Sequence, residues 1–194
     1  DTPVIQYVVE EAVASGITDI LMIIGRGKRA IEEHFDRNFE LENELHEKGK
    51  KHELEALRRI SDLADVHFVW QKELRGLGDA IFYAKNHVED EPFAVLLGDT
   101  LIRSEEPVTS QLMRTYQRYQ ESVVALEEVD PAKVSRYGVI DGNEIAPDTF
   151  LIEDLIEKPP VDSAPSNLVI AGRYVLTPEI FEFIRQTGAG KNSE

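Results

Sequence analysis

The sequence predicts an α/β fold in which a mixed, mostly parallel sheet is flanked by helices. Three observations predict it. Helical apolar stripes alternate with short apolar runs in the front half of the chain, which is typical of a parallel sheet covered by helices. The back half is rich in strand-like segments with short Gly and Pro punctuation, so it should extend the sheet with antiparallel or mixed pairs. No repeat, low-complexity tract or linker interrupts the chain, and we therefore expect residues 1–194 to form a single domain.

The front half begins with a helix and a strand. Apolar side chains at helical spacing lie between Pro3 and Gly16, and residues 18–25 form a continuous apolar run that is typical of a strand covered on both faces. Met22 in this run and Trp70 in a later one are predicted core residues. Further helices are expected over 28–36, in two pieces over 39–60 that Gly49 separates, over 77–88 and over 107–120, with strands over 66–71 and 93–99.

The back half contains strands and one closing helix. Apolar runs with short turns between them predict strands over 122–129, 137–141, 149–159 and 167–176. A helix is expected over 178–186.

The composition excludes several classes of function. The chain carries 37 acidic and 21 basic side chains and a formal charge of -16, whereas non-specific nucleic-acid binding depends on Lys and Arg that neutralise phosphates. The chain has no cysteine, so it forms neither disulfides nor thiolate metal sites. No apolar stretch approaches the roughly 20 residues that span a bilayer. We therefore expect a cytoplasmic protein without a nucleic-acid or membrane partner.

An acidic residue ends one of the predicted strands. The apolar run from Phe93 to Leu97 stops at Gly98 and Asp99, where packing alone gives a carboxylate no role. In open α/β sheets, ligands bind outside the carboxyl ends of the strands. Carboxylate oxygens suit Mg²⁺, which proteins commonly share with substrate phosphates. Asp99 therefore either caps the turn after the strand or holds a metal ion.

A glycine-containing segment follows another strand end. The stretch "QKELRGLGDA", residues 71–80, runs into a predicted helix, and Gly76 and Gly78 would let a ligand approach the backbone closely. Glycine-rich turns at helix N-termini bind anions. The segment lacks the spacing of a dinucleotide fingerprint, so an ordinary turn is the alternative interpretation.

A charged pair and two glycines mark the back half. Glu157 and Lys158 end an apolar run before two prolines, and the alternative to a ligand site is an exposed ion pair that contributes little. Neighbours in a strand point to opposite faces, so a bulge or a strand end would have to redirect one of them toward a shared ligand. Gly138 starts one strand, and Gly172 lies inside another, where a missing side chain often marks close approach of a ligand.

Eight segments occur in the order of one enzyme family. They are "IQYVVEEAVASGI", "GRGKRAIEEHFD", "GLGDAI", "EPFAVLLGD", "YGVID", "IEKPP", "SNL" and "GRYVLTPEIF". In this order the set closely resembles the bacterial UTP–glucose-1-phosphate uridylyltransferases, also called UDP-glucose pyrophosphorylases, essentially from end to end. The resemblance implies the Rossmann-like fold of the nucleotide-diphospho-sugar transferases, Mg²⁺ as the cofactor, and a homo-oligomer, either a dimer or a tetramer.

The resemblance also implies a reaction. An oxygen of glucose 1-phosphate attacks the α-phosphorus of UTP and gives UDP-glucose and pyrophosphate. The attacking phosphate is already ionised near neutral pH, because its second pKa is near 6, so no general base is required. Catalysis then consists of positioning and neutralisation of charge, and Asp99 and Lys158 would be its catalytic residues.

The resemblance gives individual residues their roles. Gln71 and the backbone of Gly76 would read the edge of the uracil, and Asp99 would hold Mg²⁺ between the nucleotide phosphates. On the sugar side, Lys158 would pair with the sugar phosphate and Glu157 would accept hydrogen bonds from the sugar hydroxyls. The remaining two sugar-binding positions are the glycines Gly138 and Gly172.

The resemblance also implies that the chain is a fragment. Relatives begin with a strand and a glycine-rich loop that grips the triphosphate, and they continue past residue 194 into a segment with a second metal-binding acid. Residues 1–194 lack both, so the fragment itself is expected to be inactive. Two alternatives stay open: a related nucleotidyltransferase that uses dTTP or another nucleotide and another sugar phosphate, and a non-catalytic module for sugar-phosphate binding or assembly.

Overall fold

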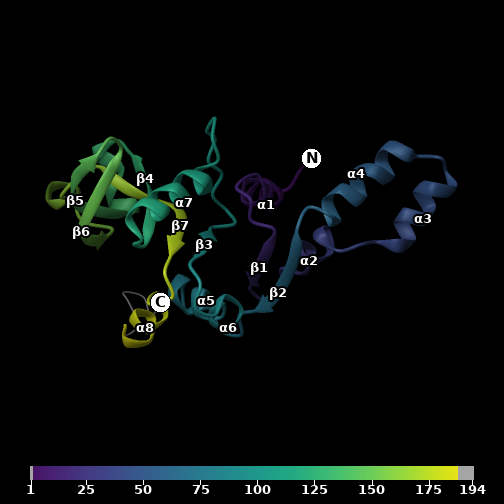
Figure 1. Ribbon diagram of the computed structural model, residues 1–194, viewed down its shortest axis with the longest axis horizontal. Helices are drawn as coiled ribbons and strands as arrows, with labels where there is room; N and C mark the ends of the chain where they lie inside the picture. Colours follow the sequence, from purple (N-terminus) through teal and green to yellow (C-terminus); the bar gives the residue numbers. More distant parts are fainter. Residues whose placement is uncertain (1, 188–194) are drawn as a thin grey trace.

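The computed structural model describes residues 2–187, and its parts lie in a row. A five-stranded sheet lies at one end, helix α1 and a two-stranded sheet lie in the middle, and a pair of helices extends at the other end (Figure 1). The ends of the predicted domain, residue 1 and residues 188–194, lie outside the described residues. None of the helices within residues 2–187 is long and apolar enough to cross a membrane.

The middle part is built around two parallel strands. β1 (Asp19–Ile24) pairs in register with β2 (Asp65–Trp70), and α1 (Val4–Ala14) and α2 (Arg29–Phe35) pack beside them. Val9, Met22, Ile24 and Phe35 form the buried core of this part. Met22 is therefore a core residue, as predicted. Trp70 is not, because it is 43% exposed at the end of a strand whose pairing within the described residues is with β1 alone.

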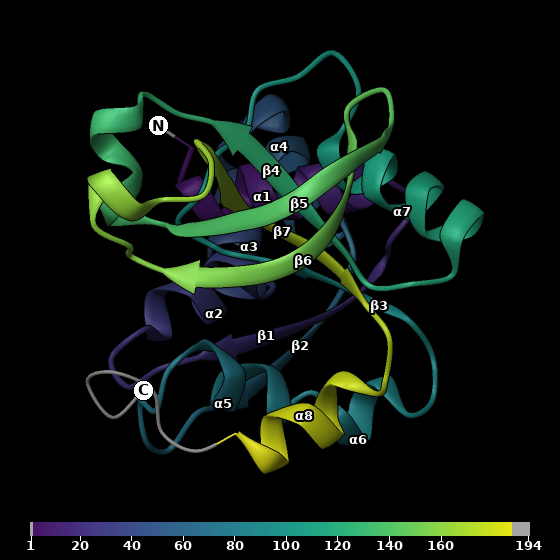
Figure 2. The same cartoon turned by 90° about the vertical axis from the view of Figure 1, so that its left-hand side faces the viewer.

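The five-stranded sheet carries the second half of the chain. Its order is β3-β7-β5-β6, and β4 also pairs with β7. Figure 2 views this sheet with β5 and β6 nearest the reader. Val139 and Val169 are buried where β5 meets β7, and Leu112 of α7 packs on the sheet against Val175. The strands are β3 (Phe93–Leu96), β4 (Val123–Glu128), β5 (Gly138–Ala146), β6 (Thr149–Glu157) and β7 (Leu168–Leu176).

Helices connect and close this sheet. The predicted helix over 77–88 is two short helices, α5 (Leu77–Phe82) and α6 (Lys85–Val88), and α7 (Val108–Tyr119) follows β3. α8 (Ile180–Gln186) is fixed by Phe181, which is 2% exposed and stacks on Phe93 of β3 with 5.4 Å between ring centroids. Two short 3₁₀ helices, η1 (Pro131–Arg136) and η2 (Val161–Ser163), flank the β5–β6 hairpin.

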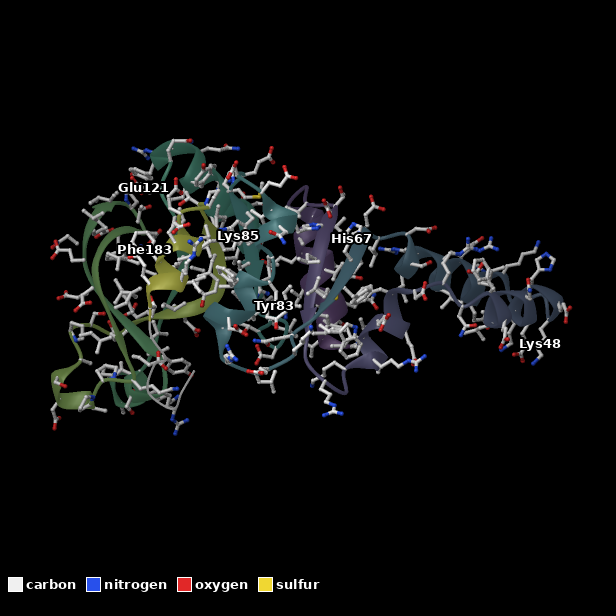
Figure 3. The ribbon with its side chains drawn as sticks, turned by 90° about the horizontal axis from the view of Figure 1, so that it is seen from below. Lys48, His67, Tyr83, Lys85, Glu121 and Phe183 are labelled. Carbon is white, nitrogen blue, oxygen red and sulfur yellow. The ribbon has the colours of Figure 1, made fainter. Side chains whose placement is uncertain are left out.

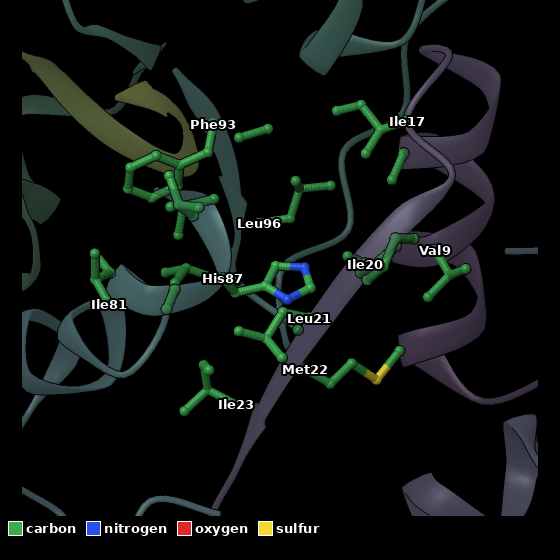
Figure 4. A pocket seen from close by; sticks show the side chains of 18 of the residues that line it. Val9, Ile17, Ile20, Leu21, Met22, Ile23, Ile81, His87, Phe93 and Leu96 are labelled. Atoms are coloured by element: carbon green, nitrogen blue, oxygen red, sulfur yellow. The ribbon is translucent and has the colours of Figure 1, made fainter. Parts of the chain in front are cut away.

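The prediction of mixed sheets is confirmed, but most of the strand pairs are antiparallel. The one parallel pair among the described strands is β1 with β2, and the pairs within the five-stranded sheet are antiparallel. A cavity of about 880 Å³ lies between β1 and β3, and the two sheets do not join there. Figure 4 shows its mainly apolar wall, with Leu21 and Ile23 on the β1 side and Phe93 and Leu96 on the β3 side.

The extended helical pair is held by one ion-paired carboxylate. α3 (Phe39–Glu47) and α4 (Lys51–Ser61) are joined by a turn at Gly49, where φ is +67°. Glu42 is 4% exposed and accepts hydrogen bonds from Arg37 and Arg58. Lys48 lies at the far tip, well away from the sheets (Figure 3). We call residues 37–61 the arm.

Candidate functional site

The predicted metal-binding residue lies on a loop directly after β3. Asp99 is exposed, and its Oδ1 lies 3.4 Å from the Thr100 hydroxyl that donates to it. Two backbone–backbone hydrogen bonds hold the loop: Leu97 N–H donates to the Gly172 carbonyl over 3.0 Å, and Thr100 N–H donates to the Leu97 carbonyl over 3.3 Å. The sequence prediction that the carboxylate follows a strand end is confirmed.

The surroundings of Asp99 fit a shared metal ion better than a protein-enclosed one. Within residues 2–187, no three His, Cys, Asp or Glu side chains cluster at distances that would enclose a metal. A single exposed carboxylate is nevertheless the kind of ligand that Mg²⁺ uses when substrate phosphates complete its coordination. The residues present are therefore compatible with a divalent ion that is bound together with a phosphorylated substrate.

Gly172 lies against the Asp99 loop. Its φ is +71°, and a Cβ there would lie 3.2 Å from both Leu97 Cδ1 and Thr100 Oγ1. A larger residue would therefore adopt an unfavourable left-handed backbone and displace the loop. Asp99 and Gly172 are 73 positions apart in sequence. The structure brings them close together, because Gly172 packs against Leu97 and Thr100 of the loop that carries Asp99.

Three other predicted residues meet at the β5–β6 pair. Gly138 pairs with Glu157, and a Cβ on Gly138 would lie 3.3 Å from Glu157 Oε2. Lys158 has φ +48°, a conformation uncommon for non-glycine residues. This turn at the strand end sets its Nζ 2.9 Å from Glu157 Oε1, while its N–H donates to the Tyr137 carbonyl over 3.0 Å. Glu157 and Lys158 are both exposed, and their charged ends lie together despite their adjacent positions in sequence.

β7 connects these two groups of residues. Burial, and then the negative charge of Glu157, raise the pKa of the Tyr174 phenol above its ordinary value. A Cβ on Gly138 would lie 3.3 Å from Glu157 Oε2 and 3.4 Å from Cδ1 of Ile170, which is two residues before Gly172. Glu157 therefore approaches β7 across Gly138. One strand thus borders both the Asp99 loop and the Glu157–Lys158 end.

The remaining two predicted residues lie beyond β2. Gln71 N–H continues the ladder by donating to the Ile24 carbonyl over 3.0 Å, and its side-chain amide donates to Asp79 Oδ2 over 2.7 Å. Gly76 precedes α5 with φ +92°, where glycine is favoured. Leu77, the next residue, lines the large cavity together with Asp99, so this segment and the Asp99 loop border the same hollow.

Sequence reasoning missed three polar residues beside these positions. They are Arg173, Glu11 and Asp79. Arg173 is 1% exposed and forms an ion pair with Glu11 at 2.8 Å, and Asp79 accepts a hydrogen bond from the side-chain amide of Gln71. Arg173 had a detectable signal, since it is a lone charge in the apolar strand segment "IAGRYVL". Glu11 and Asp79 had none, because each looks like an ordinary polar residue on a helix.

The sequence matches the family model described as nucleotidyl transferase over residues 1–194. The chain belongs to the nucleotidyl transferase family. The Rossmann-like α/β class predicted for such a chain is confirmed by this match and by the solved structures that follow.

Known members of this family are closely similar to the chain. It is 48% identical over 192 residues to a UTP–glucose-1-phosphate uridylyltransferase of Bacillus subtilis, covering 98% of the chain and 66% of that protein. A crystal structure of UDP-glucose pyrophosphorylase complexed with UDP-glucose superimposes with a TM-score of 0.88 at 41% identity, covering 100% of the chain and 71% of that structure. The UTP-bound enzyme from Acinetobacter baumannii gives a TM-score of 0.91 at 37% identity, with coverage of 96% and 67%.

These relatives confirm the resemblance seen in the sequence. The chain spans about two thirds of the length of the curated relatives that it matches. The chain shares the nucleotidyl transferase fold of these relatives. The activity of the whole protein is a proposal.

Proposed function

We propose that the protein containing this chain transfers a uridylyl group from UTP to glucose 1-phosphate, giving UDP-glucose and pyrophosphate. One observation carries the proposal: the loop of the exposed Asp99 packs on Gly172 of β7, and the exposed Glu157 approaches Ile170 of the same strand across Gly138. The relatives of the chain are named for this reaction. Lys158 offers a cation for the sugar phosphate, and Glu157 offers a carboxylate for the sugar hydroxyls. Asp99 offers a second carboxylate, which suits a metal ion shared with a nucleoside triphosphate.

The sugar phosphate is proposed to bind at the end of β6. The Lys158 ammonium would attract the phosphate, and the Glu157 carboxylate would accept hydrogen bonds from sugar hydroxyls. Their mutual contact at 2.9 Å supports this assignment, because it holds a donor and an acceptor side by side for one ligand. Gly138 and Gly172 would line the sugar pocket, because a side chain at Gly138 would displace Glu157 and one at Gly172 would displace the Asp99 loop.

The nucleotide is proposed to bind beyond β2. The Gln71 amide already donates to Asp79, which leaves its oxygen to accept the N–H of the uracil ring. The Gly76 backbone would contact the same edge of the base. Both residues lie at the carboxyl end of a parallel strand, which is where ligands bind in open α/β sheets.

Asp99 is proposed to hold Mg²⁺ together with the substrate phosphates. When bound, such an ion neutralises phosphate charge and orients the reacting groups. The carboxylate itself contributes a fixed oxygen on a loop whose backbone is hydrogen-bonded on both sides.

The reaction requires no side-chain base. A glucose 1-phosphate oxygen forms a bond to the α-phosphorus of UTP, the bond from that phosphorus to the bridging oxygen breaks, and pyrophosphate leaves with the electron pair. The nucleophile is ionised before it attacks. Lys158 and the remaining site residues therefore act by positioning and by offsetting charge.

The proposal extends to the whole protein. Residues 1–194 would form the greater part of one nucleotidyltransferase domain, acting in the cytoplasm within a dimer or tetramer. Size-exclusion chromatography with light scattering measures the assembly directly.

The test is pyrophosphate release from UTP and glucose 1-phosphate by the protein containing this chain, with dTTP and CTP as competing nucleotides. We expect Mg²⁺-dependent release with a preference for UTP, and a loss of at least about 100-fold in Asp99→Ala. Asp90→Ala removes an exposed carboxylate from the turn before β3 and should leave the rate unchanged. Release with dTTP rivalling that with UTP would contradict the uridylyl assignment, and no release with any nucleotide would contradict the enzyme.

A further inference from the structure

A buried guanidinium lies directly beneath the Asp99 loop. Arg173 of β7 is 1% exposed, and hydrogen-bond acceptors surround it. Its Nε and Nη2 donate to both oxygens of Glu11 over 2.8 to 3.2 Å. A buried charged side chain destabilises the fold unless it is paired and fully hydrogen-bonded. Arg173 therefore depends on Glu11 and on its other acceptors.

Two other hydrogen bonds of Arg173 reach the backbone before and after Asp99, and a third goes to the carbonyl of Gly172. Nη2 donates to the Thr100 carbonyl over 2.8 Å, and Nη1 donates to the Leu97 carbonyl over 3.3 Å. These carbonyls lie one residue after Asp99 and two residues before it. The peptide backbone on both sides of the carboxylate is therefore tied to one planar guanidinium, whose fork has little freedom to move.

Glu11 fixes the guanidinium from the opposite side. Its Oε1 also accepts the Thr109 hydroxyl over 2.8 Å and the Thr109 N–H over 3.3 Å, which joins α1 to α7. Burial alone would raise the pKa of Glu11, but the hydrogen bonds from Arg173 and Thr109 and the charge of Arg173 outweigh it and lower the pKa. The carboxylate is therefore ionised and available as a permanent partner of Arg173 at neutral pH.

We propose that Arg173, held by Glu11, is a positioning residue that sets where the Asp99 carboxylate stands. The inference rests on the proposed role of Asp99 in the reaction. Neither Arg173 nor Glu11 touches substrate in this account; both act through the backbone carbonyls of Leu97 and Thr100.

The arm provides a matched control. Glu42 is also a scarcely exposed glutamate bound by arginines, but its partners Arg37 and Arg58 belong to the arm, far from the five-stranded sheet (Figure 1). If buried glutamate–arginine pairs affected activity only by stabilising the fold, Glu11→Gln and Glu42→Gln would behave alike. A positioning role predicts that they differ.

The first measurement is hydrogen–deuterium exchange of metal-free protein, in the whole protein that contains this chain. We expect the peptide covering residues 97–101 to exchange at least about tenfold faster in Glu11→Gln than in the unchanged protein. Glu42→Gln should leave this peptide unchanged. Equal exchange of the peptide in a folded Glu11→Gln protein would overturn the proposal.

The second measurement asks whether Glu11 acts through Asp99. Glu11→Gln should lower kcat/KM about tenfold in the unchanged protein but less than about twofold in an Asp99→Asn background, because coupled residues are not additive. If Glu11→Gln only destabilises the fold, kcat/KM would fall by the same factor in the unchanged and the Asp99→Asn proteins, and this result would overturn the proposal. Thr109→Val, which removes only one bond to Glu11, replaces Glu11→Gln in both measurements should the latter not fold.

The two proposals fail in distinguishable ways. If the protein releases no pyrophosphate, the proposed reaction is wrong, and the exchange of residues 97–101 still decides whether Arg173 holds the loop. If the protein is active and the exchange is unaffected, the reaction stands and the positioning role falls.

Discussion

Two little-exposed glutamates in the described part of the chain, Glu11 and Glu42, bind arginine, and they differ in what else the arginine binds. In the core, Arg173 is 1% exposed and binds backbone carbonyls of the Asp99 loop as well as Glu11. In the arm, the side chains of Arg37 and Arg58 are 46% and 51% exposed while both bind Glu42. The arginine of the core pair has further donors that bind the Asp99 loop, whereas the arginines of the arm pair bind Glu42 within the arm.

The largest difference is expected in stability. Arg173→Met removes the charge that pairs with Glu11 and the hydrogen bonds to the carbonyls of Leu97, Gly172 and Thr100. We expect a loss of about 3–5 kcal/mol in the free energy of unfolding. Arg58→Met leaves Glu42 bound to Arg37 and should cost far less. Urea unfolding followed by circular dichroism measures both. Equal losses would remove the distinction between the core pair and the arm pair.

The exposed Glu157–Lys158 pair extends the comparison to a pair that faces solvent. Lys158→Ala should raise KM for glucose 1-phosphate about 10- to 100-fold with a smaller change in kcat, because a charged hydrogen bond to phosphate is present before and during the reaction. The stability should barely change, since the side chain is exposed. Steady-state kinetics with Lys51→Ala, an exposed lysine of the arm, as the control would test this; a rise in KM shared by both variants would contradict the assignment.

A smaller effect, on the preference between nucleotides, is expected at the hydrogen bond between Gln71 and Asp79. Asp79 holds the Gln71 amide at 2.7 Å, which leaves the amide oxygen for the ring N–H of uracil, whereas cytosine has an acceptor at that position. Asp79→Asn allows the Gln71 amide to turn over, so the preference for UTP over CTP should fall about tenfold. The ratio of kcat/KM for the two nucleotides measures it. An unchanged ratio would show that Asp79 does not orient Gln71.

The smallest expected effect is the pH dependence of the two glutamates. Both pKa values are lower in the folded protein than the ordinary value of 4.5, to about 2 for Glu42. Folding is therefore favoured by the ionised forms, and each contribution is complete above about pH 4.5. It is lost as the pH falls through the folded pKa, at about pH 2 for Glu42.

Unfolding free energies at a series of pH values test this directly. The stability difference between the unchanged protein and Glu11→Gln, or Glu42→Gln, should be constant from pH 7 to about 5 and should shrink in acid. If the difference in unfolding free energy grew as the pH fell, the glutamate pKa values would be raised on folding and not lowered, which would contradict this prediction.

The boundaries of several elements could be predicted because they depend on local signals, whereas β5 runs to Ala146 and not to the predicted residue 141. Gly49 separates α3 from α4, and apolar runs mark β1 and β7 within two residues of their observed bounds. The pairing could not be predicted in the same way. The sequence favoured mostly parallel strands, and the structure pairs β7 antiparallel with β3, β4 and β5, since strand partners are chosen by contacts between distant segments.

The candidate site was predictable where residues end strands, and not where they meet across the fold. Asp99 and Lys158 were identified because a charged residue after an apolar run stands out, and Gln71 was identified through the family resemblance. The Glu11–Arg173 pair joins residues 162 positions apart, so nothing near either residue in sequence predicts the other. The roles of the site residues themselves remain predictions for the experiments above.

The most direct test of the site is a crystal structure of the whole protein with UDP-glucose and Mn²⁺, which reports its position by anomalous scattering. We expect an anomalous peak within coordination distance of Asp99, the glucose against Glu157 and Gly172, and the Lys158 ammonium at the phosphate nearest the sugar. A metal held by other residues, with Asp99 turned away from the nucleotide, would contradict it.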